Sequence, residues 1–292
     1  MRVPWSQGEW QRVLVYGLGL SGRAAARLLL SRGVAVLAVD ARPREALGEL
    51  PDDPRLELLA GGEPATVPGE VDGVVVSPGV PMTRPLLADA RRRGLPVIAE
   101  VELAFPFLNG PVLAITGSNG KSTTTALAGA MLRAAGFAVE VCGNIGEPLA
   151  GKVEGPPGRV FVVELSSFQI EGIVTFAPLA AALLNIAEDH LDRYPSLDDY
   201  AAAKKALFHG MGPQAFAVLN ADDPQTTAIE TRARRRLFSR LGPVADGCFA
   251  DPADGQGRVL EVSPDGGGAV ELFRAADVPL AGVQNLENAM AA

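Results

Sequence analysis

Short apolar runs alternate with amphipathic stretches along most of the chain. Three valine-rich runs lie at 12–17, 34–40 and 73–79, and the stretches at 21–32 and 83–94 carry apolar residues at helical spacing. This alternation is typical of βαβ units, in which helices cover both faces of a parallel sheet. We therefore predict an α/β fold that begins with a Rossmann-like, doubly wound sheet.

The same alternation starts again further along the chain. Apolar, strand-like runs lie at 111–117, 159–166, 180–190 and 215–223. A strand, a glycine-rich turn and a helix at the restart predict a second α/β domain of the P-loop ATPase type. After residue 239, glycine and proline divide the apolar runs into short pieces, which predicts a small antiparallel sheet edge. We place the boundary near residue 100, which gives domains at 1–99 and 100–292.

Composition and charge narrow the classes of protein to consider. The 292 residues are 48% hydrophobic and 21% charged, as in a globular protein with room for two domains. A net charge of −8 leaves no basic surface for nucleic acid and favours a small anionic ligand. We find no signal peptide, and the longest apolar run, 176–187, is too short to span a bilayer. We expect a soluble, cytoplasmic monomer with no membrane partner. Cys142 and Cys248 are expected to be buried thiols.

The first glycine-rich turn, "GLGLSG", follows a strand and precedes a helix. Its Gly17, Gly19 and Gly22 fit the G-x-G-x-x-G pattern. Asp40 ends the next strand, where a ribose-binding acid is expected. The pattern alone suggests NAD, but any nucleoside diphosphate fits the same physics, because glycines admit a pyrophosphate and the helix N-terminus offers N–H groups. A plain tight turn is the alternative, as it is for "VSPG" at 76–79, which ends a strand at the same crevice.

The second turn, "GSNGKST" at 117–123, resembles a Walker A loop without matching it. Ile115 stands where the pattern requires glycine. Backbone N–H groups from Gly117 to Lys121 can still form an anion nest, Lys121 can reach β- and γ-phosphate oxygens, and Ser122 can ligate Mg²⁺. Lysine is rare in this chain, so its presence in this loop favours phosphate binding.

Two further candidate groups follow apolar strands. Glu164 ends the run at 159–166, where a carboxylate is costly unless it meets a cation such as Mg²⁺; a solvent-facing glutamate is the alternative. His190 follows the next strand, on the edge where the other loops converge, and we favour a functional role for it. His209, the second of two histidines, is expected at a helix end.

Several motifs occur together in the order found in the Mur ligases, and the chain resembles that family over nearly its whole length. The second domain carries "TGSNGKSTTT", "GNIG", "ELSSFQ", "NIAEDHLDRYPS", "YAAAKKALF" and "NLEN". In the first domain, "GLGLSG", "DAR" and "SPG" resemble the branch that adds D-glutamate. The resemblance implies an ATP-dependent ligase that joins D-glutamate to UDP-N-acetylmuramoyl-L-alanine through an acyl phosphate. Such a ligase serves peptidoglycan synthesis, and with it cell shape and cell division.

The resemblance assigns one nucleotide to each turn. The UDP-sugar would contact Leu20, Ser21, Asp40, Arg42, Gly79, Asn144, Ser166, Gln169 and His190. Of these, the first two would meet the pyrophosphate, the next three would border the uridine, and the last four would line the path to the muramoyl-alanine carboxylate. ATP would contact Gly117, Ser118, Asn119, Gly120, Lys121, Ser122, Thr123, Asn285 and Asn288. The catalytic residues would be Lys121, Glu164, His190 and Lys204.

The resemblance also implies two Mg²⁺ ions. Ser122 and Glu164 would hold the first, and His190 with Lys204, carbamylated by CO₂, the second. Because imidazole is an unusual ligand for Mg²⁺, Mn²⁺ suits the second site as well. Only a neutral amine captures CO₂, and desolvation raises the neutral fraction of a lysine. The neighbouring Lys205 is expected to be solvated.

Two departures from the family leave matters open. Gln284 precedes Asn285 where the family usually has His-Asn, so the contact at that position is in doubt. The family also has a third domain that closes over ATP and binds D-glutamate, and we expect this chain to be a truncated form with weak ligation or none. The alternatives are a folylpolyglutamate synthetase-like ligase, an NAD-dependent oxidoreductase supported only by the first turn, and a non-catalytic nucleotide sensor.

Overall fold

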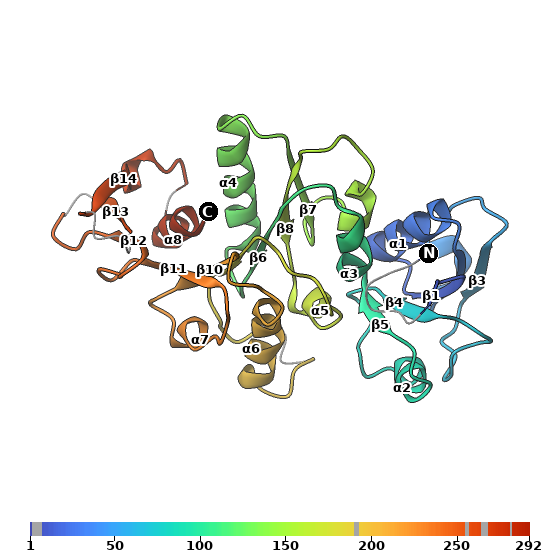
Figure 1. The fold of residues 1–292 in the computed structure, drawn as a ribbon. Helices are drawn as coiled ribbons and strands as arrows, with labels where there is room; N and C mark the ends of the chain where they lie inside the picture. The colour runs from blue at the N-terminus through green and yellow to red at the C-terminus, as the bar shows by residue number, and fades with distance from the viewer. Residues whose placement is uncertain (2–7, 190–192, 255–256, 264–267, 281) are drawn as a thin grey trace. The chain divides into compact units, whose positions relative to one another are not determined.

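The computed structural model describes residues 1, 8–189, 193–254, 257–263, 268–280 and 282–292, which are traced in Figure 1. These residues fall into two units. The first comprises Met1–Asn109, Cys142–Pro157 and Ser166–Phe176; the second comprises Gly110–Val141, Gly158–Leu165 and Ala177–Ala292. The chain passes between the units several times, so segments far apart in the sequence build each of them.

The first unit contains a five-stranded parallel sheet in the order β3-β2-β1-β4-β5. The strands are β1 (Arg12–Tyr16), β2 (Ala35–Asp40), β3 (Leu56–Ala60), β4 (Gly73–Val76) and β5 (Val97–Ala99). The helices are α1 (Leu20–Ser31), α2 (Pro85–Arg92), α3 (Glu100–Ala104) and α5 (Ser167–Ile170), with 3-10 turns η1 (Arg44–Ala46), η2 (Phe105–Phe107) and η3 (Leu149–Lys152). The strand order reverses at β1, which confirms the predicted Rossmann-like, doubly wound sheet.

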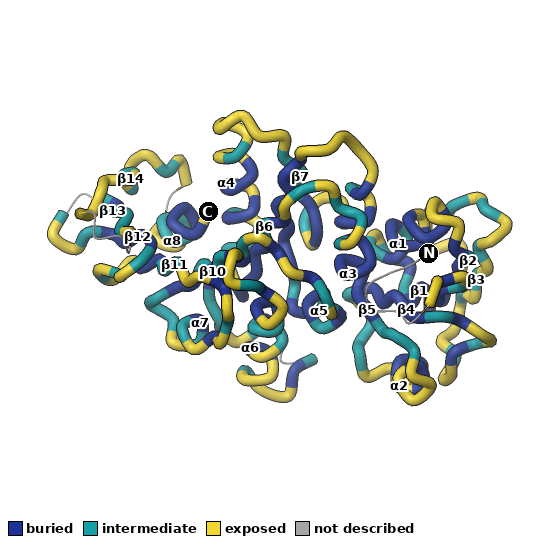
Figure 2. Tube along the Cα trace, viewed as in Figure 1, coloured by how far each residue is buried: buried dark blue, intermediate teal, exposed yellow. Residues whose placement is uncertain are grey.

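Alternate residues of these strands are buried on opposite faces of the sheet. On one face, the buried cluster contains Leu14, Tyr16, Leu37, Val39, Val74 and Val76, together with Leu86, Leu87 and Ala90 of α2. The intervening Val13, Val15 and Ala38 are buried as well, and α1 contacts β1, β2 and β4. Valine-rich strands that are apolar at every position are therefore buried on both faces. The edge strand β3 is partly exposed (Figure 2).

Two buried carboxylates on α3 attach the later segments to the first unit. Glu102 accepts hydrogen bonds from the backbone N–H groups of Val174, Thr175 and Phe176 at 2.9, 2.7 and 3.0 Å. Glu100 accepts one from the N–H of Ala150, in η3. These bonds satisfy backbone donors that would otherwise be buried without a partner.

The second unit is built on a nine-stranded sheet in the order β14-β13-β12-β11-β10-β9-β6-β8-β7. The strands are β6 (Val112–Thr116), β7 (Val139–Gly143), β8 (Val160–Glu164), β9 (Ala180–Leu183), β10 (Phe216–Asn220), β11 (Arg234–Ser239), β12 (Gly247–Ala250), β13 (Arg258–Val262) and β14 (Val270–Arg274). The helices are α4 (Lys121–Ala134), α6 (Leu197–Lys205), α7 (Pro224–Thr227) and α8 (Val283–Ala291), with 3-10 turns η4 (Ala206–Phe208) and η5 (Ala275–Asp277).

The pairing of these strands confirms the predicted second α/β fold with a small antiparallel edge. β8, β6, β9, β10, β11 and β12 pair in parallel, whereas β13 and β14 pair antiparallel. In Figure 1, α4 lies beside β6 and β8, and α8 packs between α4 and the antiparallel edge.

Local details differ from the sequence expectations in one place and agree in another. The strand predicted at 180–190 is only Ala180–Leu183, because the polar residues after it form a loop against the second glycine-rich turn. Both Cys142 and Cys248 are buried free thiols, as expected. Among the helices described here, none is long and apolar enough to cross a membrane.

Candidate nucleotide-binding and catalytic sites

A cavity of about 560 Å³ opens in the first unit at the carboxyl ends of β1, β2 and β4. Open α/β sheets bind ligands at this edge, where the strand order reverses. Its walls include seven residues predicted to contact a UDP-sugar: Leu20, Ser21, Asp40, Arg42, Gly79, Asn144 and Gln169. Ser166 is not in the wall, but its hydroxyl accepts the backbone N–H of Gln169 and thereby caps α5. His190 lies outside the described residues.

At two positions of the first turn, the structure shows why the residue must be glycine. Gly17 has φ +85°, a conformation that side chains disfavour. A Cβ at Gly22 would lie 1.8 Å from the carbonyl oxygen of Gly17, so α1 can approach β1 only if Gly22 has no side chain. Gly19, in contrast, has open space where a Cβ would stand. The backbone can therefore come close to a ligand at this turn.

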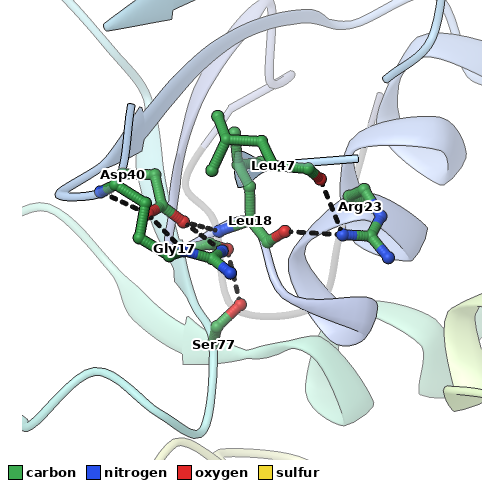
Figure 3. A network of polar contacts seen from close by, with 7 residues as sticks. Gly17, Leu18, Arg23, Asp40, Leu47 and Ser77 are labelled. Carbon is green, nitrogen blue, oxygen red and sulfur yellow. Dashed lines mark hydrogen bonds and ion pairs between the residues drawn. The ribbon is translucent and has the colours of Figure 1, made fainter. Parts of the chain in front are cut away.

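Asp40 organises the turn from the end of β2 (Figure 3). Its carboxylate accepts the N–H of Leu18 at 2.6 Å, and Arg42 donates to both oxygens, from Nε at 2.9 Å and from Nη2 at 2.8 Å. Burial alone would raise the pKa of Asp40, but these hydrogen bonds and the charge of Arg42 outweigh it and lower the pKa to about 2. Asp40 is therefore ionised at neutral pH and fixes the guanidinium of Arg42 in the cavity wall.

Three side chains of this cavity wall that can ionise were not predicted from the sequence. They are Tyr16, Glu63 and Arg84, whereas Ser77 belongs to the predicted turn at 76–79. Ser77 donates its hydroxyl to the carbonyl of Gly17 at 2.6 Å and so joins the end of β4 to the turn (Figure 3). Tyr16 ends β1 and Glu63 follows β3; the position at a strand end was the available signal, but β3 itself was not predicted.

In the second unit, the turn between β6 and α4 surrounds the ammonium group of Lys121. Its Nζ donates to the carbonyl oxygens of Gly117 at 3.0 Å and Ser118 at 2.8 Å, which holds the side chain over its own loop. Ser122 is exposed in the first turn of α4, where the N–H groups have no intrahelical partner. The loop thus gathers a cation, a hydroxyl and free backbone donors at one helix N-terminus.

The anion nest is narrower than the sequence predicts. The N–H of Ser118 donates to the carbonyl of Asn185 at 3.0 Å, and the N–H of Asn119 donates to the Asn185 side chain at 2.8 Å. These two donors are committed to the loop after β9 and do not face a ligand. Of the predicted nest, the N–H groups of Gly117, Gly120 and Lys121 remain, and those of Ser122 and Thr123 extend it along the first turn of α4. Gly120 at φ +84° turns the chain into this helix.

Helix α8 brings the predicted Asn288 to the same turn. Thr124 donates its hydroxyl to the Asn288 side-chain oxygen at 3.2 Å, and the Asn288 amide donates to Asn285 at 3.1 Å. A Cβ at Gly120 would lie 2.2 Å from that Asn288 oxygen. Both asparagines predicted to approach ATP are therefore linked to each other, and one of them is packed against the phosphate loop.

Lys204, on α6, is almost fully buried at 1% exposure. Its Nζ lies 3.5 Å from the Thr116 hydroxyl oxygen and 4.6 Å from the centre of the Tyr200 ring. Burial lowers the pKa of Lys204 to about 7; the charge of Lys121 lowers it too, while Asp189 and Glu164 oppose the shift. A large share of Lys204 is therefore uncharged at neutral pH.

The predicted metal ligands are only partly placed by the structure. Glu164 is buried at 2% exposure at the end of β8, where it pairs in register with Ile115 of β6. Within the part of the chain that the structure describes, no three His, Cys, Asp or Glu side chains are grouped as a metal site. The predicted set uses a hydroxyl, a modified lysine and His190, which lies outside the described residues, so it stays a prediction.

The expectations for Lys205 and His209, two residues near Lys204, had different outcomes. Lys205 is not simply solvated, because its half-buried ammonium donates to the Gln225 side chain at 2.8 Å. That expectation was wrong, since α7 packs close enough to provide an acceptor. His209 is exposed and follows the last residue of η4, which agrees with its predicted place at a helix end.

Two regions of the chain match models of known domains. Residues 11–99 match the MurD-like N-terminal domain of Mur ligases, and residues 115–292 match the Mur ligase middle domain. Both glycine-rich turns fall within these matches. An NAD-dependent oxidoreductase, which the first turn alone allowed, therefore finds no support here.

Curated relatives match nearly the whole chain. The UDP-N-acetylmuramoylalanine–D-glutamate ligase of Pelotomaculum thermopropionicum is 43% identical, and the match covers 97% of this chain and 62% of that protein. The ligase of the same name from Anaeromyxobacter dehalogenans is 46% identical, with 100% of this chain and 64% of that protein covered. The chain thus spans less than two thirds of the length of these relatives.

Solved structures share the fold. The UDP-N-acetylmuramate:L-alanyl-gamma-D-glutamyl-meso-diaminopimelate ligase of Neisseria meningitides superposes with a TM-score of 0.58 at 18% identity, covering 97% of this chain and 92% of that one. UDP-N-acetylmuramate-alanine ligase of Thermotoga maritima gives a TM-score of 0.52 at 20% identity, covering 97% and 64%. At such identities the likeness concerns the fold alone.

Proposed function

The chain belongs to the Mur ligase family, and on that premise we propose that it carries the UDP-sugar-binding and ATP-binding parts of an ATP-dependent acid–D-amino-acid ligase. The reaction joins D-glutamate to UDP-N-acetylmuramoyl-L-alanine in the synthesis of peptidoglycan precursors. The name shared by the two curated relatives supports this substrate pair.

The observation that carries the proposal is the presence of two phosphate-type turns, one in each unit, with different chemistry. The first turn lies at a cavity with Asp40 and Arg42 in its wall, as a nucleotide-sugar site requires. The second turn presents Lys121 at the N-terminus of α4, as a triphosphate site requires. A protein that uses one nucleotide needs only one such turn, whereas a ligase that activates a UDP-linked acid with ATP needs both.

The chemistry is amide formation through an acyl phosphate. The muramoyl-alanine carboxylate attacks the γ-phosphorus of ATP and releases ADP, and the D-glutamate nitrogen then displaces phosphate through a tetrahedral intermediate. Both reactants of the first step are anions, so positive charge at the transferring phosphate is the main catalytic requirement. Lys121 supplies that charge from the phosphate loop, and the N–H groups from Gly120 to Thr123 orient the phosphates.

The residues of the second unit fit divalent cations. Ser122 and Glu164 would hold one Mg²⁺, and His190 with carbamylated Lys204 would hold a second Mg²⁺ or Mn²⁺. Glu164 offers a buried carboxylate at the end of β8, and hard cations favour carboxylate oxygen ligands. When bound, the ions neutralise charge on the phosphates.

Carbamylation of Lys204 is chemically reasonable in this environment. The uncharged amine forms a bond from Nζ to the carbon of CO₂ and releases one proton, which leaves an anionic carbamate. An ordinary lysine is uncharged in only about one molecule in a few thousand at pH 7. The lowered pKa of Lys204 removes most of that barrier.

Titration calorimetry of this chain tests the proposal. We expect binding of UDP-N-acetylmuramoyl-L-alanine and, separately, of Mg²⁺–ATP, with no binding of NAD. A chain that binds NAD or a folate in place of the UDP-sugar would contradict it. We further propose that the protein works as a cytoplasmic monomer, and analytical ultracentrifugation would check its oligomeric state.

A further inference from the structure

The cavity of the first unit contains two ion pairs that are built differently. Arg42 uses Nε and Nη2 on the two oxygens of Asp40, so this edge of its guanidinium is committed to one carboxylate. Arg84 forms an ion pair with Glu63, with Nη1 3.2 Å from Oε2. The Arg84 side chain is 44% exposed, and in the described part of the chain it has no two-bond fork like that of Arg42.

Tyr16 lies beside the second pair. It ends β1 in the core cluster and lines the same cavity as Glu63. Burial, and then the neighbouring Glu63 carboxylate, raise the pKa of Tyr16 to about 12, so its hydroxyl stays protonated and can donate to that carboxylate. A rigid strand thus places a donor beside Glu63, and Glu63 in turn lies beside the guanidinium of Arg84.

The charges of the cavity wall show why the Arg84–Glu63 pair matters for binding a diphosphate. Its charged members are Asp40, Arg42, Glu63 and Arg84, two of each sign. A nucleoside diphosphate adds at least two negative charges, which this neutral wall does not compensate. Both arginines keep N–H groups that their carboxylates do not use. Arg84 differs in that no two-bond fork holds its guanidinium among the described residues, so it can turn N–H groups to an oxyanion while it stays near Glu63.

We propose that Arg84 is the diphosphate-binding cation of this cavity and that Tyr16 and Glu63 are its positioning residues. The inference rests on the proposed function, since it takes the ligand to be a UDP-sugar. Glu63 competes with the phosphate oxygens for the guanidinium. The cavity therefore selects ligands in two ways. Arg84 favours ligands with more phosphate charge, and the wall around Asp40 and Arg42 recognises the nucleoside.

Titration of the chain with uridine, UMP and UDP separates these roles. We expect Arg84→Gln to weaken UDP binding about tenfold or more and to leave uridine binding within about twofold of wild type. Arg84→Lys, which keeps the charge but not the fork, should lose less. Arg27→Gln removes an exposed arginine of α1 that is not in the cavity wall. It should change the affinity for neither uridine nor UDP.

The positioning residues give a second readout. Glu63→Gln removes the competing charge but keeps an acceptor for Tyr16, so UDP binding should tighten while uridine binding stays the same. Tyr16→Phe should weaken UDP binding alone. Unchanged UDP affinity in Arg84→Gln, or equal losses for uridine and UDP, would overturn the inference. A wild-type chain that binds none of the three uridine ligands would instead overturn the proposed function, and the inference with it.

Discussion

Lys204 and Thr116 face each other inside the second unit, with Nζ 3.5 Å from the threonine hydroxyl oxygen. The hydroxyl donates to the carbonyl of Leu165 at 2.8 Å, so it offers Lys204 only its oxygen as a weak acceptor. Lys204 therefore meets a neutral oxygen and an aromatic ring, and in the described part of the chain no carboxylate forms an ion pair with it. A lysine in such a place is a poor structural cation and a good nucleophile.

The first prediction is that Lys204 takes up CO₂ near neutral pH. With a pKa of about 7, roughly half of its amines are uncharged at pH 7, which is far more than for an exposed lysine. Carbon NMR of the chain with labelled bicarbonate should show one carbamate signal between pH 7 and 8. Lys204→Arg should abolish the signal, and the neighbouring Lys205→Arg should keep it.

The proposed modification predicts an effect on ligation, to be measured in a protein that spans the whole length of the curated ligases. Lys204→Ala should impair ligation, and added short carboxylates should partly restore it by replacing the oxygen ligand. A bare ammonium on Lys204 in an active, substrate-bound enzyme would refute the assignment. The second metal would then need another anionic ligand, for which Asp189 is a candidate; Asp192, the other, lies outside the described residues.

The second prediction is that the two nucleotides can be lost independently. Lys121→Ala removes a cation whose hydrogen bonds, in the described part of the chain, go to its own loop, so it should weaken Mg²⁺–ATP binding by roughly 10- to 100-fold and leave UDP-sugar binding intact. Asp40→Ala should do the reverse, because it frees Arg42 and the first turn. Calorimetry with both ligands on both variants measures this. Loss of both ligands in Lys121→Ala would indicate a folding defect.

Hydrophobic periodicity predicted the parts of the fold that are buried on both faces. Strands such as β1, β2 and β8 are apolar at consecutive positions, and their runs stand out in the sequence. β3 was missed because its residues alternate between half-buried and exposed at the sheet edge. The transfer of residues 142–157 and 166–176 to the first unit was also invisible, because it depends on buried Glu100 and Glu102 meeting distant backbone N–H groups.

The site was predictable where chemistry follows strand ends and not where loops meet. Asp40 and Lys121 follow from strand–turn–helix patterns, and the structure places each at its glycine-rich turn. The sequence could not show that Asn185 accepts the N–H groups of Ser118 and Asn119, because this depends on how the loop after β9 folds back. The pairing of Glu63 with Arg84 likewise joins loops that no local pattern connects.

The third prediction compares two glycines of the first turn. In Gly22→Ala the new methyl group would lie 1.8 Å from a carbonyl oxygen, so α1 must shift, and we expect a loss of stability of about 1–3 kcal/mol or more. Gly19→Ala meets open space at φ −65° and should change stability by less than about 0.5 kcal/mol. Urea denaturation followed by tryptophan fluorescence measures both. Equal midpoints for the two variants would contradict the steric argument.

The fourth prediction concerns the pH dependence of stability, through Glu100. Burial raises the pKa of Glu100 from 4.5 to about 7, and the hydrogen bond from Ala150 only partly opposes the shift. Because the folded-state pKa is the higher one, the folded protein binds the extra proton. This contribution to stability is complete below pH 4.5, falls as the pH rises, and is lost above about pH 7.

Glu100→Gln should remove that pH dependence. The amide oxygen can still accept the Ala150 N–H, but the variant has no proton to lose, so its stability relative to wild type should improve by up to roughly 3 kcal/mol between pH 4 and pH 8. The buried Oε2 of Glu100 has no hydrogen-bond partner among the described residues, so the amide nitrogen that replaces it costs stability equally at every pH. Urea midpoints across this pH range measure the difference, with exposed Glu49→Gln as the control. A difference between Glu100→Gln and wild type that stays constant with pH would show that Glu100 titrates normally in the folded protein, and that the attachment of η3 to α3 does not depend on its protonation.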